Sequence, residues 1–341
     1  MPATPATPAI SAASATPGPP AGPCDVLLVS LASTHGLRHA DAELLASLRR
    51  AGATVVLATA APPRRRLPTL ALTDLAWALS ARRAAVRALA VHDPRAVLYS
   101  TTTAALFWPR PGAIRFDALS AANRPGRHGL WQRPLERRRL ARASVLVPWC
   151  EGSLFGVPAR ARARPRARTR GHSDFDVLVP LPVPVEPSPP PAGPGGRAPI
   201  RDIPAITYAA NPTKKGLDRV LSAWASVRPP GQLLYVAGTT PAELAAASIP
   251  VPGPTAGVHF TGPLPHQEYR ALLRRSRVFV TAPRREDYGL AQLEALADGC
   301  LLVTAPAPGP YAALAIARRL DERLVADDLA GALRLALAGG H

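Results

Sequence analysis

The residues best suited to chemistry lie in the second half of the chain, in the stretch REDYGLAQLEALADG at 285–299. This stretch places Glu286 and Glu294 on either side of a Tyr-Gly-Leu segment, with seven residues between them. An ionised carboxylate can accept two O–H hydrogen bonds, as a diol requires. Two carboxylates that face one crevice would therefore suit a ligand rich in hydroxyl groups.

The elements that would position these carboxylates can be read from the flanking residues. The apolar runs VFVTAP (278–283) and LLVTAP (301–306) predict buried strands on either side. Between them apolar residues recur at helical spacing, and Gly299 stands where a C-terminal cap belongs. The predicted helix carries Glu294 on the flank of its apolar face, and Glu286 follows the carboxyl end of the first strand. Ligands bind at that edge of open parallel sheets, so we expect both glutamates to face one crevice.

Strands alternate with helical stretches along the whole chain, which predicts an α/β fold of two βαβ domains with a cleft between them. The other predicted strands are DVLLVSL (25–31), TVVLATA (54–60), AVLYST (96–101), AIRFDA (113–118), SVLVPW (144–149), FDVLVPLPV (175–183), AITYAA (205–210), LLYVAG (233–238) and VHFTG (258–262). The other predicted helices are DAELLASLRRAG (41–52), DLAWALSARRAAVRALAV (74–91), PLERRRLARA (134–143), LDRVLSAWASV (217–227), HQEYRALLRRS (266–276) and DDLAGALRLALA (327–338).

The domain limits follow from proline and glycine. Residues 1–22 read as a disordered Pro/Ala-rich tail, and the Pro/Gly-rich run at 186–199 reads as a linker because proline lacks the N–H and fixes φ. The predicted domains are therefore residues 23–185 and residues 200–341.

Composition narrows the class of protein. A chain of 341 residues with 47% hydrophobic content can build two cores, and no apolar run approaches the roughly 18 residues of a membrane span. The N-terminus has no signal-peptide pattern. Three scattered cysteines, Cys24, Cys150 and Cys300, argue against a disulfide framework or a zinc knuckle, so the expected compartment is the cytoplasm.

A net charge of +18 favours binding to a polyanion, either a nucleic acid or an anionic membrane surface. The densest basic tract, ARARARPRARTR (159–170), has no aromatic residue, whereas nucleic-acid surfaces usually mix stacking rings with charge. The tract is read as a solvated loop or as a contact for anionic lipid head groups on the inner face of the membrane. The basic helix ERRRLARA (136–143) is likewise read as a solvated face or as a contact for anionic lipid head groups. No nucleic acid is expected.

Three segments occur together in a recognisable order and spacing: NPTKKGLDRVLSAW (211–224), FTGPLPHQEYRALLRRSRVFVTAP (260–283) and EDYGLAQLEALADG (286–299). In these the chain resembles the retaining GT-B glycosyltransferases of family 4, whose E-x7-E motif Glu286 and Glu294 match. The resemblance is close over residues 205–315 and covers the first half only by pattern. It implies two Rossmann-like domains facing a cleft, and transfer of a sugar from a nucleoside diphosphate sugar to an acceptor hydroxyl. It implies neither a cofactor nor a required metal.

The resemblance also implies roles for individual residues. Glu294 would accept hydrogen bonds from the ribose hydroxyls, and Glu286 would bind the sugar near the anomeric carbon. The N–H groups of Gly289 and Leu290, at a helix N-terminus, would meet the diphosphate, as the helix dipole favours. Lys215 matches the phosphate-binding lysine of the family, with Lys214 beside it. The remaining donor-binding residues that the motifs imply are Asn211, Tyr288 and Gly262.

The sequence departs from the family in its acceptor-side half. The family's usual arginine before the lysine is missing from TYAANPTKKG, and a glycine pair after the first strand is replaced by STHGLRH with only Gly36. No histidine matches the catalytic-region histidine of the family, and Asp117, with Arg124 nearby, is the candidate in its place. Two other functions therefore stay open: a non-catalytic GT-B descendant that binds a nucleotide or glycan, and a basic, membrane-associated interaction protein.

Two patterns resemble metal sites, and neither is expected to be one. Asp174 and Asp176 in DFD match the metal-binding DxD of another glycosyltransferase architecture, but the surroundings of that fold are missing. His35 and His39 stand one helical turn apart, without an acidic or cysteine partner nearby in the sequence, so a surface or core role is the expectation.

Overall fold

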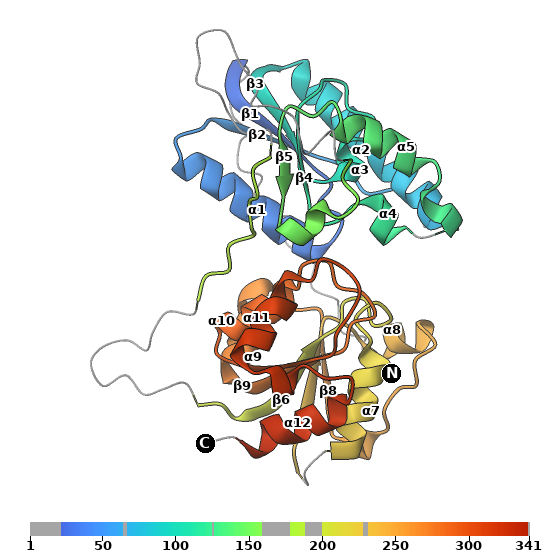
Figure 1. Cartoon of the computed structure of the whole chain (residues 1–341), viewed down its shortest axis with the longest axis vertical. Helices are drawn as coiled ribbons and strands as arrows, with labels where there is room; N and C mark the ends of the chain where they lie inside the picture. The colour runs from blue at the N-terminus through green and yellow to red at the C-terminus, as the bar shows by residue number, and fades with distance from the viewer. Residues whose placement is uncertain are drawn as a thin grey trace, which may run out of the picture.

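The computed structural model describes residues 22–63, 67–124, 126–158, 178–187, 200–227 and 231–339. They form two parallel sheets of five strands, each covered by helices (Figure 1). Within these residues, no helix is long and apolar enough to span a bilayer. The two Rossmann-like α/β domains agree with the fold class predicted from the sequence.

The N-terminal domain has the strand order β2-β1-β3-β4-β5, with every pair parallel. Its strands are β1 (Gly22–Ser30), β2 (Val55–Thr59), β3 (His92–Tyr99), β4 (Ala113–Phe116) and β5 (Leu146–Pro148). Its α-helices are α1 (His35–Arg50), α2 (Leu70–Leu89), α3 (Thr102–Ala105), α4 (Ser120–Asn123) and α5 (Gln132–Leu140), with short 3-10 turns at Gly126–Gly129 and Glu151–Leu154.

The C-terminal domain has the strand order β10-β9-β6-β7-β8, again all parallel. Its strands are β6 (Ile203–Tyr208), β7 (Leu234–Ala237), β8 (Val258–Gly262), β9 (Ser276–Thr281) and β10 (Leu301–Thr304). Its α-helices are α7 (Leu217–Val227), α8 (Pro241–Ala246), α9 (His266–Arg275), α10 (Leu290–Ala297), α11 (Ala312–Leu320) and α12 (Leu329–Ala338), with 3-10 turns at Pro254–Ala256 and Glu322–Leu324.

The strands read as continuous apolar runs because helices cover both faces of each sheet. In β9, Val278 and Val280 point into the core cluster that α7 and α12 complete, whereas Phe279 points into the cluster that α9 and α10 complete. In β1, Leu27 and Leu28 divide in the same way between the α2 and α1 sides. Side chains of a strand alternate between faces, so a run of apolar residues fills both cores at once.

Local capping explains where several helices begin. The side chain of Thr34 accepts a hydrogen bond from the Leu37 N–H at the start of α1, and Thr69 does the same for Leu72 at the start of α2. Thr240 and Glu243 form a reciprocal capping box on α8, a short helix that the sequence analysis did not predict. The helix α11 was missed as well.

One predicted strand is wrong. In the described part of FDVLVPLPV, residues 178–183, Leu178 forms an isolated bridge with Leu146, and the Val179 and Leu181 N–H groups donate to the Leu146 and Pro148 carbonyl oxygens of β5 at 2.8 and 2.9 Å, but no regular strand forms. Pro180 and Pro182 alternate with these two donors and have no N–H of their own, so the segment can lie only at an edge of the sheet, where it stays irregular. Residues 175–177 lie outside the described residues, as do the arginine tract at 159–170, the DFD pattern at 174–176, residues 188–199 of the predicted linker and nearly all of the predicted tail. Strand β1 begins at Gly22, one residue inside that tail.

The two domains share a small apolar cluster. It joins Ala40 and Trp149 of the N-terminal domain to Tyr288 of the C-terminal domain, with Val183 from the connecting segment. The Trp149 and Tyr288 rings meet edge to face at 5.3 Å between centroids, and the Tyr288 hydroxyl accepts a hydrogen bond from the Val183 N–H at 3.2 Å. Tyr288 therefore lies at the contact between domains, directly before α10.

Candidate functional site

A cavity of about 700 Å³ lies between the two domains and is lined by both of them. The loop after β1 and the start of α1 supply one wall, with Asp117 after β4, and the loops after β6 and β9 supply the opposite wall. Strands β6 and β9 are neighbours at the point where the strand order of the second sheet reverses. Ligands of open parallel sheets bind at such a point, so the topology places a site here.

Two glycines let backbone segments of the C-terminal domain pack closely against each other beside the cavity. Gly289 has φ +90° and caps α10, and a Cβ atom there would lie 2.7 Å from the Cβ of Ala313. Gly216 has φ +60°, and a Cβ atom would lie 1.9 Å from the carbonyl oxygen of Ala282. A side chain at either position would be strained and would clash. The N-terminus of α10 thereby opens into the cavity at Leu290 and Ala291.

Two lysines of the loop after β6 pair with two acids of the loop after β9. The Lys215 Nζ lies 2.5 Å from the Oε2 of Glu286, and the Lys214 Nζ lies 2.8 Å from the Oδ2 of Asp287. Asn211 holds the lysine loop, because its Oδ1 accepts the Lys214 N–H at 2.9 Å. The positive and negative groups that a sugar diphosphate needs are therefore in contact with each other in this structure.

Glu286 is buried and has further support. The side-chain amide of Gln292, itself buried, donates to the Glu286 Oε2 at 3.2 Å and lies 3.3 Å from the Tyr311 hydroxyl. That hydroxyl contacts the Thr304 hydroxyl at 2.7 Å, at the end of β10. The carboxylate is thus held in one orientation from β10 and α10.

Glu294 is buried in α10 and meets two histidines. The Nε2 of His266, at the start of α9, lies 2.8 Å from the Glu294 Oε1, and the Nε2 of His39, in α1 of the other domain, lies 3.9 Å from the same oxygen. The histidine rings lie 4.5 Å apart. Burial, and then the neighbouring His266, lower the pKa of His39, so its imidazole is neutral at neutral pH. The expectation that no acidic partner accompanies His39 is wrong, because Glu294 approaches it from the second domain.

Asp117 is the acid of the opposite wall. Burial, and then the nearby Asp287 carboxylate, together raise its pKa to about 6, although Lys214 opposes the shift. Its Oδ1 accepts the Ala118 N–H at 2.8 Å. A carboxyl group that titrates near pH 6 inside a cleft can exchange a proton with a bound ligand.

A bridge between the domains borders the same cavity. The Arg285 Nε lies 3.1 Å from the Asn123 Oδ1 in α4 and 3.0 Å from the Asp287 Oδ1 in its own loop. In the loop after β9, Asp287 therefore pairs with Lys214, and Arg285, two residues earlier, contacts the N-terminal domain.

The cavity brings together most of the residues that the sequence analysis proposed. Its lining contains Glu286, Asp117, Glu294, Lys215, Lys214, Asn211, Gly289, Leu290 and Tyr288. Gly262 is not among the lining residues; it ends β8, and the two residues after it, Pro263 and Leu264, reach the cavity instead. Arg124 pairs with the buried Asp74 of α2, at 2.5 Å between Nε and Oδ2.

Several residues of the site were missed from the sequence. Three of them lie inside the motifs quoted in the sequence analysis: Asp287, Gln292 and His266. Their polar character within those motifs was the signal that could have identified them as site residues. Arg285 and His39 act across the domains, and their partners Asn123 and Glu294 could not be inferred from spacing along the chain.

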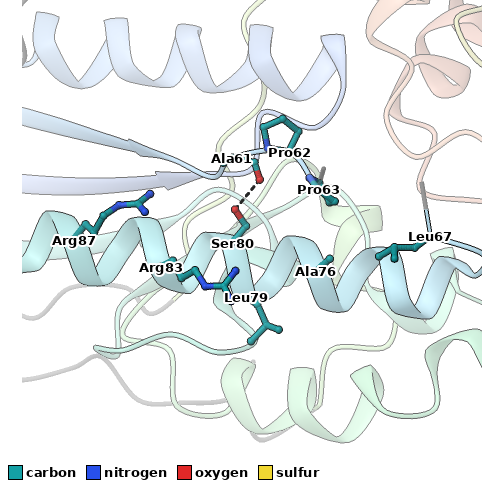
Figure 2. A pocket seen from close by; sticks show the side chains of 9 residues that line it. All are labelled: Ala61, Pro62, Pro63, Leu67, Ala76, Leu79, Ser80, Arg83 and Arg87. Carbon is teal, nitrogen blue, oxygen red and sulfur yellow. Dashed lines mark hydrogen bonds between the residues drawn. The ribbon is translucent and has the colours of Figure 1, made fainter. Parts of the chain in front are cut away.

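A second hollow, of about 640 Å³, lies in the N-terminal domain between α2 and the loop after β2 (Figure 2). Its lining is mostly apolar, including Leu67 and Leu79, with Arg83 and Arg87 at one end, and the Ser80 hydroxyl donates to the Ala61 carbonyl oxygen at 2.7 Å. It contains none of the proposed site residues and no carboxylate, so it does not suit sugar transfer.

Comparison with known proteins agrees with this geometry. Residues 203–338 match the family model described as glycosyl transferases group 1. No curated protein matches the chain. Several solved structures match the whole fold at low sequence identity.

Three of these structures illustrate the match. The glycosyltransferase WaaG, involved in lipopolysaccharide biosynthesis, is 15% identical over 93% of this chain and 94% of its own, with a TM-score of 0.54. An alpha,alpha-trehalose-phosphate synthase from Burkholderia xenovorans, in complex with glucose-6-phosphate, is 14% identical over 93% and 92%, with a TM-score of 0.60. A trehalose-6-phosphate structure from E. coli, bound with UDP-2-fluoro glucose, is 13% identical over 93% and 94%, with a TM-score of 0.54.

At these identities the structural likeness shows the fold, and the family match adds the sugar-transfer domain. The chain is therefore a glycosyltransferase enzyme with the GT-B fold of two Rossmann-like domains, and its second domain matches the model of the glycosyl transferases group 1.

Proposed function

We propose that this protein is a retaining glycosyltransferase of the family 4 type, which moves a sugar from a nucleoside diphosphate sugar to an acceptor hydroxyl. The observation that carries the proposal is the cluster of Lys214, Lys215, Glu286 and Glu294 around the N-terminus of α10, on one wall of the cavity. This wall offers cations and free backbone N–H groups for a diphosphate and carboxylates for hydroxyl groups.

In this proposal the donor exchanges the contacts that now join the side chains. Its diphosphate accepts from Lys214, Lys215 and the first N–H groups of α10. Glu286, held by Gln292 at 3.2 Å, then accepts hydroxyl hydrogen bonds from the sugar, and Glu294 accepts them from the ribose. Because the lysines are already positioned by their acidic partners, little reorganisation is needed when the diphosphate binds.

Transfer with retention breaks the bond between the anomeric carbon and the phosphate oxygen, and forms a bond from that carbon to the acceptor oxygen on the same face. The acceptor proton passes to an oxygen of the leaving diphosphate. Charge grows on that leaving group, and the fixed positive charge of Lys215 and Lys214 lowers the barrier. Since the two lysines and the helix dipole supply this charge, the proposal requires no metal ion and no cofactor for transfer.

The donor and acceptor classes are the finer part of the proposal. The structure from E. coli carries UDP-2-fluoro glucose and that from Burkholderia xenovorans carries glucose-6-phosphate, which makes UDP-sugars and sugar phosphates the first compounds to test. Asp117 lies on the wall that faces the donor groups, where an acceptor hydroxyl would approach. A glycan, a lipid-linked glycan and a small metabolite are all open as acceptors.

Thermal unfolding with UDP, GDP, ADP and dTDP in turn tests the donor site. A ligand at about 100 times its Kd adds roughly 2.7 kcal/mol to stability. We expect one nucleotide to raise the midpoint by several degrees in the wild type and to lose most of that effect in Glu294→Ala. The matched control is Glu268→Ala, because Glu268 is exposed on the neighbouring helix α9 and outside the cavity.

The same measurement separates the proposal from its rivals. If no nucleotide shifts the wild-type midpoint, donor binding is refuted. If a nucleotide binds but the matching sugar nucleotide is neither hydrolysed nor transferred to any hydroxyl acceptor offered, the chain is a nucleotide-binding GT-B protein without turnover.

A second proposal concerns the membrane. Helix α2 exposes an apolar stripe at seven-residue spacing, Leu72, Leu79 and Val86, beside the exposed Arg82, Arg83 and Arg87. An exposed apolar stripe flanked by arginines is typical of a helix that lies on an anionic bilayer surface. We therefore propose peripheral contact through α2, next to the hollow of Figure 2.

Co-sedimentation with vesicles tests this contact. Binding to vesicles with about one third phosphatidylserine is expected to fall severalfold in Leu79→Ser/Val86→Ser and to weaken as salt rises. The control is Leu320→Ser, which removes an even more exposed leucine, 66% against 37% for Leu79, from α11 in the other domain. If the wild type, the double variant and the control bind the vesicles equally, α2 is not the membrane contact.

A further inference from the structure

Three potential metal ligands meet across the two domains, at a place where the proposed reaction needs no metal. They are His39 in α1, His266 at the start of α9 and Glu294 in α10. One ligand atom from each lies within 4.8 Å of the other two. The Glu294 Oε1 lies 2.8 Å from the Nε2 of His266 and 3.9 Å from the Nε2 of His39.

This set of donors matches a chemical class of ion. Two imidazole nitrogens and one carboxylate oxygen form a set that binds Zn²⁺ in proteins with a fourth position open, at about 2.0–2.2 Å from each atom. Around a tetrahedral ion such atoms lie roughly 3.3 Å apart. The two distances above fall on either side of that value, and the third separation, between the histidine ligand atoms, is at most 4.8 Å, so the ligand atoms have to approach by no more than about 1.5 Å to hold one ion. Mg²⁺ and Ca²⁺ prefer oxygen ligands and fit this set poorly.

The cluster is also accessible. The Glu294 side chain is only 6% exposed, but those of His39 and His266 are 18% and 28% exposed. His39 and Glu294 both line the inter-domain cavity, which gives an ion an entry path and leaves room for a water molecule as fourth ligand.

We propose that His39, His266 and Glu294 form an inter-domain binding site for one divalent transition-metal ion, with Zn²⁺ as the best-suited ion. The ion ties α1 of the N-terminal domain to α9 and α10 of the C-terminal domain. It also engages the carboxylate that the donor ribose would use, so metal and nucleotide exclude each other. This second consequence rests on the proposed function, whereas binding of the ion does not. The site departs from the expectation that the chain has no metal ligands.

A simpler role for the same contacts predicts a different result. His266 could serve only to orient Glu294 through its 2.8 Å contact, with His39 packed against it. In that case neither imidazole needs to bind a metal, and loss of His39 would not change the response of the protein to Zn²⁺.

Calorimetric titration of the metal-free, full-length protein with ZnCl₂ distinguishes these roles. We expect one site, weakened more than about tenfold in His39→Ala and in His266→Ala, because each removes one of three ligands. His259→Ala is the matched control, since His259 is exposed on β8 and outside the cluster. MgCl₂ should give no binding at this site. Wild-type affinity in His39→Ala would overturn the proposal.

Co²⁺ provides a second readout that depends on the ligand type. The chain has Cys24, Cys150 and Cys300, and a thiolate-bound Co²⁺ would show a sulfur-to-metal charge-transfer band in the near ultraviolet. Four-coordinate visible absorption without that band, lost in His266→Ala, supports the proposed ligands. A charge-transfer band that persists in both histidine variants assigns the ion to cysteine and refutes the site.

Repeating the zinc titration with a saturating nucleotide separates the two proposals. If Zn²⁺ binds through the histidines and no nucleotide binds, the metal site stands and the donor proposal fails. If a nucleotide binds and Zn²⁺ does not, the reverse holds. If both bind, we expect the nucleotide to weaken Zn²⁺ binding at least about tenfold, and independent binding would refute the shared use of Glu294.

Discussion

Replacing Lys215 by methionine is expected to lower the free energy of unfolding by about 3 kcal/mol and to reduce transfer about 10²- to 10³-fold. The lysine side chain is 20% exposed and its partner Glu286 is 7% exposed, at 2.5 Å between Nζ and Oε2. Without the lysine, the Glu286 carboxylate is left buried with only the weaker support of Gln292. Urea unfolding and initial rates with the identified donor measure the two effects.

A double variant separates the structural loss from the chemical one. Lys215→Met/Glu286→Gln removes both charges of the pair, so stability should return to within about 1 kcal/mol of the wild type. Activity should stay low, because both groups act on the donor in the proposal. Lys214→Met is the matched single variant: its lysine is 41% exposed, so its stability cost should be about 1 kcal/mol or less. Equal destabilisation by the two single variants would contradict this account.

Replacing Asp117 by asparagine is expected to stabilise the protein at pH 8 while it impairs transfer. The folded state raises the pKa of Asp117 from 3.8 to about 6, so the folded protein binds this proton more tightly than the unfolded chain. The favourable contribution is fully present below about pH 4 and is lost as pH rises through about 6. Asparagine carries no charge at any pH, so the gain should reach about 2 kcal/mol at pH 8 and vanish near pH 4.

Thermal unfolding of Asp117→Asn between pH 4 and pH 8 tests this sign, with an expected rise in midpoint of about 5 °C at pH 8. Wild-type transfer should increase as pH rises through about 6, and the variant should lose that step together with at least about tenfold in rate. Asp93→Asn is the control, because the Asp93 side chain is 93% exposed. A midpoint difference that does not change with pH would refute the raised pKa of Asp117.

Periodicity predicted most of the fold because its causes are local. Helix α7 begins and ends at the predicted residues 217 and 227, and both glutamates of the E-x7-E pattern line one cavity, as expected from a strand, a loop and a helix in sequence. The strand predicted at 175–183 is irregular in its described part, where Val179 and Leu181 donate to β5 but Pro180 and Pro182 have no N–H to donate, a limit that apolar content alone does not show.

The rest of the site depends on contacts between residues far apart in the chain. Arg285 and Asn123 are 162 positions apart, and His39 meets Glu294 from the other domain. The pairing of Lys214 with Asp287 spans 73 positions. Nothing in the spacing along one chain states which loops of two separate sheets will face each other, so these partners required the three-dimensional structure.

The segment from Arg285 to Leu293 contacts both the ligand cavity and the N-terminal domain. Arg285 reaches Asn123, Tyr288 packs on Trp149, and Leu290 and Leu293 join the shared apolar cluster, while Glu286 and Gly289 line the cavity between them. The two domains are therefore not interchangeable modules. A chimaera that takes its N-terminal domain from a relative would have a mismatched surface against this segment, and ligand binding in the cavity would change even though no residue of the C-terminal wall had been replaced.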